Sequence, residues 1–453
     1  MNTMGADLVQ YSEVSSKRQK ANKIDVLVDE LFVEIFCRLP CHKTVTLCKL
    51  VCKHWAALVY KPFFVSRFVA FRAGQCIAPC AYEDGISKYD ERRVEMMNDQ
   101  TFGVLIRKKW GWSKGLMIHF NNNPIYSPKN LSCSRLPRLV NKGLPRNLTV
   151  VGACNDLLLY MYQRHEDKFD YRKFELYICN AQTKQCLALP SLDLPSMTRN
   201  IGNIGFMCDP CYSRDASSNW SLDETFCACI IFIPYITGEV SKLPAYLLSP
   251  YTGGVWREVI LSSPLRCELL CKCPITSIGR KLHVPCYGCL NGFDPFVDWS
   301  NGTSKDIVIQ CDSIPTPPCL VTMIVFFGVF HEQLYMCDRE DSGRYRVWVL
   351  KDYVTGEWSL RHNIMGQDWI PRDLHLVKLI NRRPLFGNTI GFHPATPDVI
   401  YVLCKRWIVL CNLATKEMEI ATKLPKSSYD LFPGSYPFQI TFPVWPTPLP
   451  ILA

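Results

Sequence analysis

Four short phrases constrain the fold most, because each places a threonine in a polar turn between two apolar runs. They are "NAQTKQCLALP" at Thr183, "SPYTGGVWREV" at Thr252, "DYVTGEWSLRH" at Thr355 and "NLATKEMEIATKLP" at Thr415. The pattern is typical of antiparallel hairpins, and Thr-Gly suits a two-residue turn because glycine takes a positive φ at low cost. The phrases return at uneven intervals, so we interpret them as an internal repeat with loops of variable length.

A second element recurs between these turns, in which two polar residues precede a leucine and a strand-like run. It is seen in "NDLLLY" (155–160), "RKLHV" (280–284) and "EQLYM" (332–336). Alternating the two elements gives one antiparallel sheet per repeat. The sequence therefore predicts a large all-β domain over residues 101–445, either a β-propeller of four-stranded sheets or a large β-sandwich.

The N-terminal part has a different period. Apolar residues fall at helical spacing over residues 24–68 and stop at Pro40 and again at Pro62, because proline ends a helix. We expect a multi-domain chain: a disordered lead at 1–22, a small all-α unit at 23–70, a linker at 71–100 and the β-domain. The first helical stripe contains Leu27, Leu31, Phe32, Ile35, Phe36 and Leu39, and the second contains Cys48, Val51, Cys52, Trp55, Leu58 and Val59.

The 24 cysteines could all be paired in a secreted protein. However, "MNTMGADLVQYSEVSSKRQK" has no apolar core or cleavage site and does not resemble a signal peptide. We therefore expect reduced, buried cysteines in a protein of the cytoplasm, the nucleus or both. The longest apolar run, "CLVTMIVFFGVF" (319–330), is too short to cross a bilayer and predicts a buried strand.

Two patterns could carry chemistry. "GWSKG" (111–115) fits the Gly-x-Ser-x-Gly motif with Ser113 as nucleophile, but the motif needs a following helix, and "LMIHF" predicts a strand. Cys-x-x-Cys occurs at 208–211 and 286–289, whereas zinc sites usually hold two such pairs about fifteen to twenty residues apart. The net charge of +10 comes from scattered basic residues, which argues against nucleic acid. We expect no catalytic residue, cofactor, metal or membrane.

The helical stretch resembles an F-box over about residues 26–68. The match reads "LVDELFVEIFCRLP", followed by "KLVCKHWAALVYKPFF". Val28 stands where the family usually has proline, and Leu47 where plant members usually have arginine. Losing proline removes a rigid helix start, which predicts weaker partner affinity. The phrases "ICNAQTKQCLALP", "RVWVLKDYVTGEW" and "GFHPATPDVIYV…NLATKEMEI" resemble the kelch-like F-box-associated domain of plant F-box proteins.

The resemblance implies a non-catalytic substrate receptor of an SCF-type (Skp–cullin–F-box) ubiquitin ligase. The F-box would bind a Skp-type adaptor, and through it cullin, while the β-domain would capture an unidentified protein target for ubiquitination. Periodicity does not separate the residues that face the adaptor from those that hold the helices together. The adaptor-binding candidates are Leu27, Val28, Leu31, Ile35, Leu39, Pro40, Val51, Cys52 and Trp55.

Two other functions remain open at this point. The chain could be an F-box binding module that acts outside the ligase. It could also be an enzyme built on a β-propeller, although that requires titratable groups converging at a central channel, and the sequence nominates none. The long irregular segments 190–225 and 285–320 are the expected recognition loops, since loops commonly carry binding residues.

Overall fold

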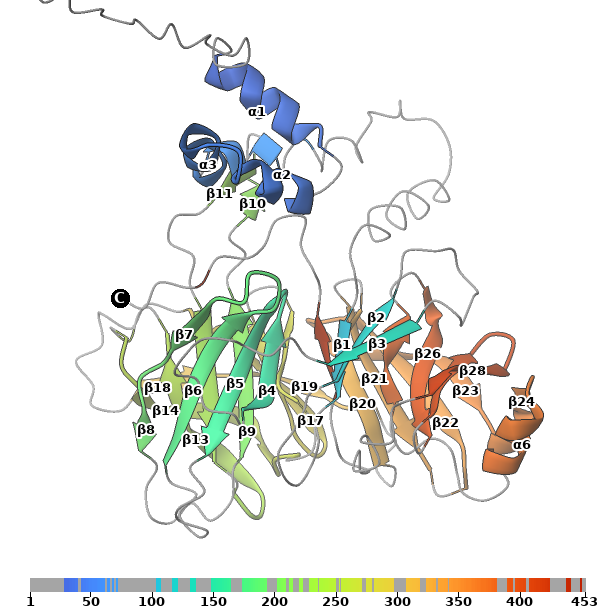
Figure 1. Cartoon of the computed structure of the whole chain (residues 1–453). Coiled ribbons are helices and arrows are strands. Elements are labelled where there is room, and N and C mark those ends of the chain that lie inside the picture. The colour runs from blue at the N-terminus through green and yellow to red at the C-terminus, as the bar shows by residue number, and fades with distance from the viewer. Residues whose placement is uncertain are drawn as a thin grey trace, which may run out of the picture. The chain divides into compact units, whose positions relative to one another are not determined.

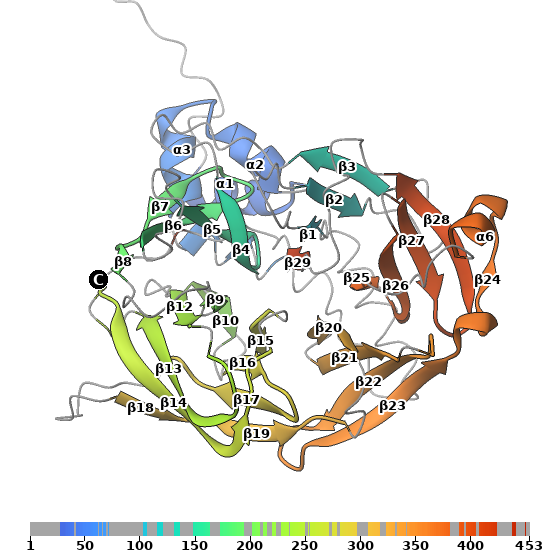
Figure 2. The same cartoon turned by 90° about the horizontal axis from the view of Figure 1, so that it is seen from below.

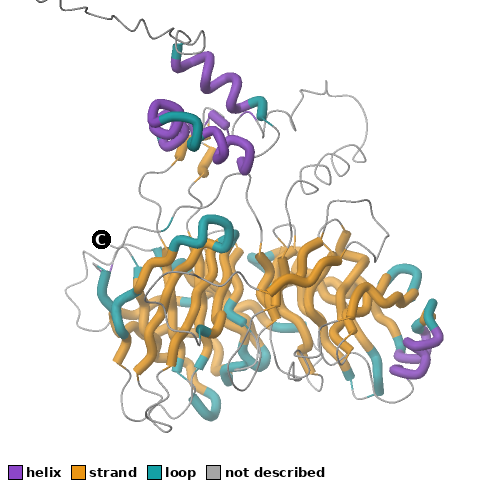
Figure 3. Tube along the Cα trace, viewed as in Figure 1, coloured by secondary structure: helices purple, strands orange, loops and turns teal. Residues whose placement is uncertain are grey.

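The structure, a computed structural model, divides the chain into two compact units, residues 1–68 and 69–453 (Figure 1). The first is helical, and strands dominate the second (Figure 3). The expected lead at 1–22, Ser113 and all of the expected linker but Phe71 lie outside the described residues. These are 28–39, 42–61, 63–65, 67–68, 71, 103–106, 116–120, 131–135, 148–163, 173–193, 202–208, 212–214, 220–222, 228–234, 236–249, 252, 254–270, 274–278, 281–296, 307–317, 323–330, 333–340, 342–380, 389–393, 396–404, 407–423, 437–440 and 449.

Three labelled helices form the first unit: α1 (Asp29–Cys37), α2 (His42–Cys48) and α3 (Lys53–Tyr60). The second predicted stripe is not one helix, because Cys52 is extended with φ −158° and separates α2 from α3. The Cys52 sulfur accepts the backbone N–H of Trp55 at 3.4 Å. This bond satisfies one of the unpaired N–H groups at the start of α3, so Cys52 acts as an N-cap.

Strands of the second unit are arranged in sheets of four or five, apart from the pair β10 (Tyr212–Arg214) and β11 (Trp220–Leu222). Along the chain, the first larger sheet contains β1 (Gly103–Ile106), β2 (Leu116–Phe120) and β3 (Leu131–Arg135) with β29 (Pro437–Ile440), and the second contains β4 (Thr149–Cys154), β5 (Leu157–Gln163), β6 (Lys173–Asn180), β7 (Cys186–Ala188) and β8 (Leu192–Asp193). The third contains β9 (Asn203–Cys208), β12 (Ala228–Ile233), β13 (Val240–Leu248), β14 (Arg257–Cys267) and β18 (Ile307–Gln310), and the fourth contains β15 (Thr276–Ile278), β16 (Lys281–Pro285), β17 (Cys289–Phe293) and β19 (Asp312–Pro315). The fifth contains β20 (Met323–Phe330), β21 (Gln333–Arg339), β22 (Tyr345–Asp352) and β23 (Glu357–Ile364), and the sixth contains β24 (Ile370–Pro371), β25 (Thr389–His393), β26 (Thr396–Cys404), β27 (Trp407–Asn412) and β28 (Glu417–Lys423).

These sheets close a ring (Figure 2). The innermost strands contact one another in the cyclic order β4, β9, β15, β20, β25, β29 and back to β4. The sheet that closes the ring joins both ends of the unit, since β29 pairs with β1 from Gly103↔Ile440 to Ile106↔Pro437. The second unit is therefore a β-propeller, and the sandwich alternative is wrong. A helix, α6 (Leu374–Ile380), follows β24.

The four threonine phrases all fall between the third and fourth strands of their sheets, counted outward from the axis. The prediction of hairpins is confirmed, but the two-residue turn is wrong. Four residues separate the paired residues Asp352 and Glu357. The Asp352 carboxylate accepts the N–H groups of Val354 and Thr355 at 2.8 and 3.4 Å. An Asx turn therefore sets the loop, and Gly356, with φ +69°, completes it.

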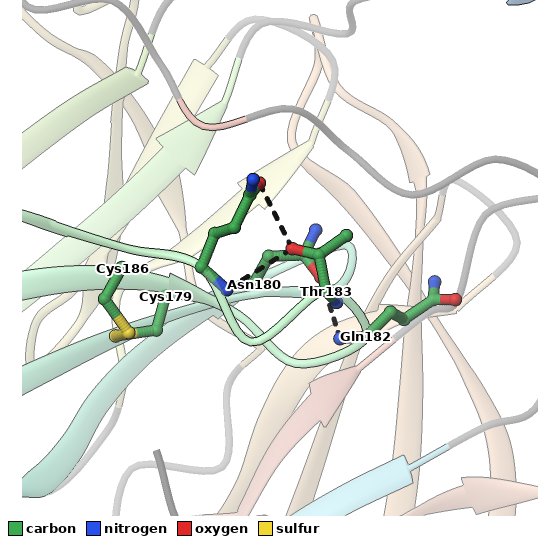
Figure 4. The surroundings of a disulfide bond; sticks show 6 residues. Cys179, Asn180, Gln182, Thr183 and Cys186 are labelled. Atoms are coloured by element: carbon green, nitrogen blue, oxygen red, sulfur yellow. Dashed lines mark hydrogen bonds between the residues drawn. A yellow bond between two sulfur atoms is a disulfide. The ribbon is translucent and has the colours of Figure 1, made fainter. Parts of the chain in front are cut away.

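The same turn recurs where the first residue is asparagine. Asn180 Oδ1 accepts the N–H groups of Gln182 and Thr183 at 2.7 and 2.8 Å (Figure 4), and Asn412 does the same in the β27–β28 loop. Lysine takes the last position there, and Lys184 and Lys416 both have φ +61°. In these three turns the Asp or Asn three residues before the threonine accepts the hydrogen bonds, whereas at Thr252 the threonine hydroxyl itself bonds to the backbone of Ser249.

The expectation of reduced cysteines is only partly right. A disulfide joins Cys179 and Cys186, which are paired residues of β6 and β7 beside the Asn180 turn (Figure 4). Directly opposed residues of an antiparallel pair lie close enough for such a bond. Most of the other cysteines in the described part of the chain are buried, as expected.

Candidate functional site

One side of α1 presents an apolar surface to solvent. Val28, Leu31 and Ile35, which recur at helical spacing, have 57%, 49% and 48% of their surface exposed. We call these three residues the α1 face. Large apolar residues aligned on a helix that remain exposed within a folded unit are typical of surfaces that bind a partner.

The opposite side of α1 forms the core of the helical unit. Phe32 and Phe36 are buried, and the half-buried indole of Trp55 on α3 lies against both rings, with centroid separations of 5.3 and 5.0 Å. Aromatic contacts at this separation stabilise helix packing beyond the burial of area alone. Of the nine candidates, Trp55 therefore belongs to the core rather than to the exposed surface.

The other candidates have different surroundings. Val51 and Cys52 are exposed in the segment between α2 and α3, and Leu39 is half-buried after α1. Leu27 and Pro40 lie outside the described residues. The candidates therefore fall into two groups: the α1 face, Val51 and Cys52 are exposed to solvent, whereas Trp55 packs between the helices.

Two exposed leucines on the same unit were not among the candidates. Leu47, near the end of α2, and Leu50, just after it, have 63% and 81% of their surface exposed. Leu47 was noted only as a departure from the family pattern. The end of α2 at Cys48 could have found Leu50, since residues beyond it no longer follow the buried face of the helix, but Leu47 lies within α2 and had no such signal.

Ion pairs hold α1 to the residues that follow it in the unit. Asp29 lies 3.0 Å from His54 and 3.2 Å from Lys61, and Glu34 contacts Arg38 and Arg67 at 2.7 and 3.2 Å. Hydrogen bonds from Arg38 and then Arg67 lower the pKa of the Glu34 carboxyl. These contacts anchor α1 to the rest of the helical unit.

In the described part of the propeller, no group of three or more His, Cys, Asp or Glu side chains is arranged to hold a metal ion. The backbone N–H of Cys208, from the first Cys-x-x-Cys pair, donates to the sulfur of Cys154 at 3.3 Å. The segment after "GWSKG" is strand β2, paired with β1, as the sequence predicted.

His283, a fully buried histidine of the propeller, contacts the side chain of Tyr353. Its Nε2 lies 3.0 Å from the hydroxyl of Tyr353, and its ring is fully buried. Burial lowers the pKa of His283 to about 4 and raises that of Tyr353 to about 12. Both groups are therefore neutral near pH 7, which suits a structural contact between sheets better than proton transfer.

The expected recognition segments are more regular than predicted. Within 285–320, the described residues include strands β17, β18 and β19, and Leu290 and Phe293 are buried in the core. Residues 190–225 contain the fully buried strand β9 and the hairpin β10–β11. The length of these segments predicted irregular loops, but their described residues include strands of the larger sheets and one separate hairpin.

Comparison with known proteins adds no family. No protein-family model matches the chain, and no curated protein matches it. No helix in the described residues is long and apolar enough to span a membrane.

Solved structures resemble the chain only distantly. The β-propeller domain of the Trilobed protease from Pyrococcus furiosus is 9% identical with a TM-score of 0.31, covering 71% of this chain and 92% of that one. The Cps50 (Swd1) β-propeller domain of Myceliophteria thermophila is 11% identical at 0.32, covering 69% and 81%. Apo AztD from Citrobacter koseri is 8% identical at 0.31, covering 72% and 83%. Such scores carry no functional argument, and the assignment of a β-propeller rests on the ring of sheets.

Proposed function

We propose that the protein is a substrate receptor of an SCF-type ubiquitin ligase, with the helical unit as an F-box and the propeller as the target-binding domain. The single observation that supports this most is the exposed α1 face. Leu31 and Ile35 match the F-box motif in sequence, and their side chains are exposed although the unit has a packed aromatic core. Under this proposal a Skp-type adaptor covers them.

The proposed role needs no chemistry in this chain. Ubiquitin transfer to a target lysine is performed by other subunits, and a receptor contributes by holding the target close, which raises its effective concentration. A rigid ring of sheets suits that role, because a preorganised surface loses little entropy on binding.

The test is retention of the adaptor by the full chain. The wild-type protein is co-expressed with a Skp-type adaptor and purified through a tag on the receptor. Leu31→Asp places a charge in the α1 face and should abolish retention while the protein still folds, since Leu31 is half exposed. Phe63→Asp is the matched control, because Phe63 is similarly exposed at 58% but lies outside the α1 face, and it should retain the adaptor.

Two outcomes separate the alternatives. A wild-type protein that never retains the adaptor would overturn the F-box assignment. A protein that retains the adaptor but fails to bring cullin with it would favour a binding module that acts outside the ligase.

A further inference from the structure

Two sheets of the propeller receive an extra strand from a distant part of the same chain. β18 pairs with the outer side of β14, from Val259↔Ile307 to Ser262↔Gln310, and the pairing is parallel. β24 pairs with β28 in the same parallel sense, with Ile370 opposite Glu417. The outer edge of a blade in this protein is therefore a surface that accepts an extended segment.

Both added strands occupy the same part of the outer strand. On β14, the added strand ends at Ser262, where the register with β13 shifts between Ser262 and Cys267. On β28, it covers Glu417 and Met418, and the register with β27 shifts later, between Ile420 and Thr422. The accepting segment thus lies before the β-bulge, where the strand is not yet bent away.

β23 has a comparable stretch of regular pairing without an extra strand. It is the outermost strand of its sheet, and its register with β22 shifts between Glu357 and Trp358 and again between Leu360 and His362, which leaves Trp358–Leu360 in continuous register between the two shifts. Within the described part of the chain, nothing pairs with its outer side. At 8 residues it is longer than the other uncovered outer strands, β3, β7 and β19, which have 5, 3 and 4. A long unpaired edge is a template for pairing with another chain.

Contacts to the neighbouring sheets hold this edge in place. The Trp358 indole N–H donates to the carbonyl oxygen of Pro315 in the preceding sheet at 2.9 Å. On the other side, Arg361 and His362 contact the carboxylate of Asp398 in the next sheet at 3.0 and 2.9 Å. The edge is therefore preorganised between two anchors, which lowers the entropic cost of adding a strand.

We propose that the outer edge of β23, at Trp358–Leu360, binds an extended segment of a protein target that adds as a parallel strand. Its role as a target site rests on the proposed function. The two strands supplied by this chain indicate the chemistry of the segment: each places an isoleucine, Ile307 or Ile370, at its first paired position. Leu360, with 44% of its surface exposed, offers an apolar contact for such β-branched residues.

The probe is a fluorescent peptide with the sequence of residues 304–310, Ser-Lys-Asp-Ile-Val-Ile-Gln, which contains β18. Its binding to the full chain is followed by fluorescence anisotropy. Leu360→Lys should weaken binding at least tenfold without lowering the melting temperature, because a lysine on an edge strand opposes pairing. Val354→Lys is the matched control, since Val354 is 92% exposed in the β22–β23 turn rather than on the edge, and it should bind as the wild type does.

Hydrogen exchange then locates the bound peptide, and the expected result is slower exchange of backbone amides within 357–362. Failure of the wild-type chain to bind the peptide, equal binding by Leu360→Lys, or protection confined to another segment would each overturn the proposal. Adaptor retention is measured on the same variants, and Leu360→Lys should keep it. If the wild-type chain binds the peptide but not the adaptor, the proposed ligase role is wrong, whereas the proposed peptide site on β23 is still supported.

Discussion

Trp358 donates its indole N–H to the carbonyl oxygen of Pro315 at 2.9 Å, and so links the outermost strands of two adjacent sheets. Trp256 makes the equivalent bond to Pro190, also at 2.9 Å, between another pair of adjacent sheets. In each case a tryptophan near the start of a fourth strand reaches a proline carbonyl at or just after the end of the fourth strand of the preceding sheet. The repeat thus includes a hydrogen bond between sheets as well as the turn within each sheet.

Replacing either tryptophan by phenylalanine should weaken the ring modestly. Trp256→Phe and Trp358→Phe keep an aromatic ring but remove the donor, so each should lower the free energy of unfolding by about 1 kcal/mol, the usual net value of one hydrogen bond. Denaturant unfolding of the single and double variants would measure this. Since the two sites share no partner, their effects should add; no change in either variant would show that the bonds contribute nothing to stability.

Trp55→Ala should disrupt the helical unit itself. Removing a ring that packs on Phe32 and Phe36 should cost about 3 kcal/mol, and a unit this small has little stability to lose. Hydrogen exchange in the full chain should show loss of protection across α1 and α3. Leu31→Asp should keep that protection, so retained protection in Trp55→Ala would contradict the assignment of Trp55 to the core.

Val28→Pro should stabilise the start of α1. Val28 has φ −73°, which proline adopts without strain, and proline is favoured where a helix begins. The gain should be about 0.5 kcal/mol, because proline restricts the unfolded chain. Slower hydrogen exchange in the first turn of α1 would show it, and adaptor retention should rise if the F-box proposal holds. Faster exchange in Val28→Pro would contradict this prediction, because it would mean that valine at this position stabilises the start of α1 better than proline does.

Stability should fall as the pH drops below about 6.5, the pKa of histidine in an unfolded chain. Burial lowers the pKa of His283 and of His393 to about 4, so the unfolded chain takes up their protons first. The stabilisation is complete above pH 6.5 and is lost as the pH falls toward 4, by about 3 kcal/mol for each histidine.

His283→Gln separates one contribution, because glutamine can keep a hydrogen bond to Tyr353 but does not titrate. Thermal unfolding at pH 7.5 and pH 5 should show a smaller loss in this variant than in the wild type. An equal loss in both proteins would mean that His283 does not contribute to the pH dependence.

The disulfide between Cys179 and Cys186 should contribute to stability without being needed for the hairpin. Closing so short a loop restricts the unfolded chain by about 2 kcal/mol in the chain-entropy model. Cys179→Ala/Cys186→Ala should lose that amount, whereas the turn persists through the bonds to Asn180 Oδ1. Reductant should destabilise the wild type equally and leave the double variant unchanged; an effect of reductant on both would assign the change to other cysteines.

Local sequence determined much of the architecture. The alternation of apolar residues predicted strands such as "YRVWVLKD", which is β22 from Tyr345 to Asp352, and the threonine phrases predicted hairpins at Thr183, Thr252, Thr355 and Thr415. These features are readable because each depends on residues within one turn or one strand, where side-chain period and turn chemistry act directly. The helical period of residues 29–37 was readable for the same reason.

Tertiary structure alone decided what those elements do together. Ring closure by β1 and β29 and the addition of β18 to a neighbouring sheet join residues far apart in sequence, and no local period encodes such pairs. The same is true of the site: Leu31 and Phe32 are adjacent apolar residues of one helix, yet Leu31 is exposed and Phe32 is buried. The aromatic contact with Trp55 decides that difference, because only the packing of α3 fixes which side of α1 becomes core.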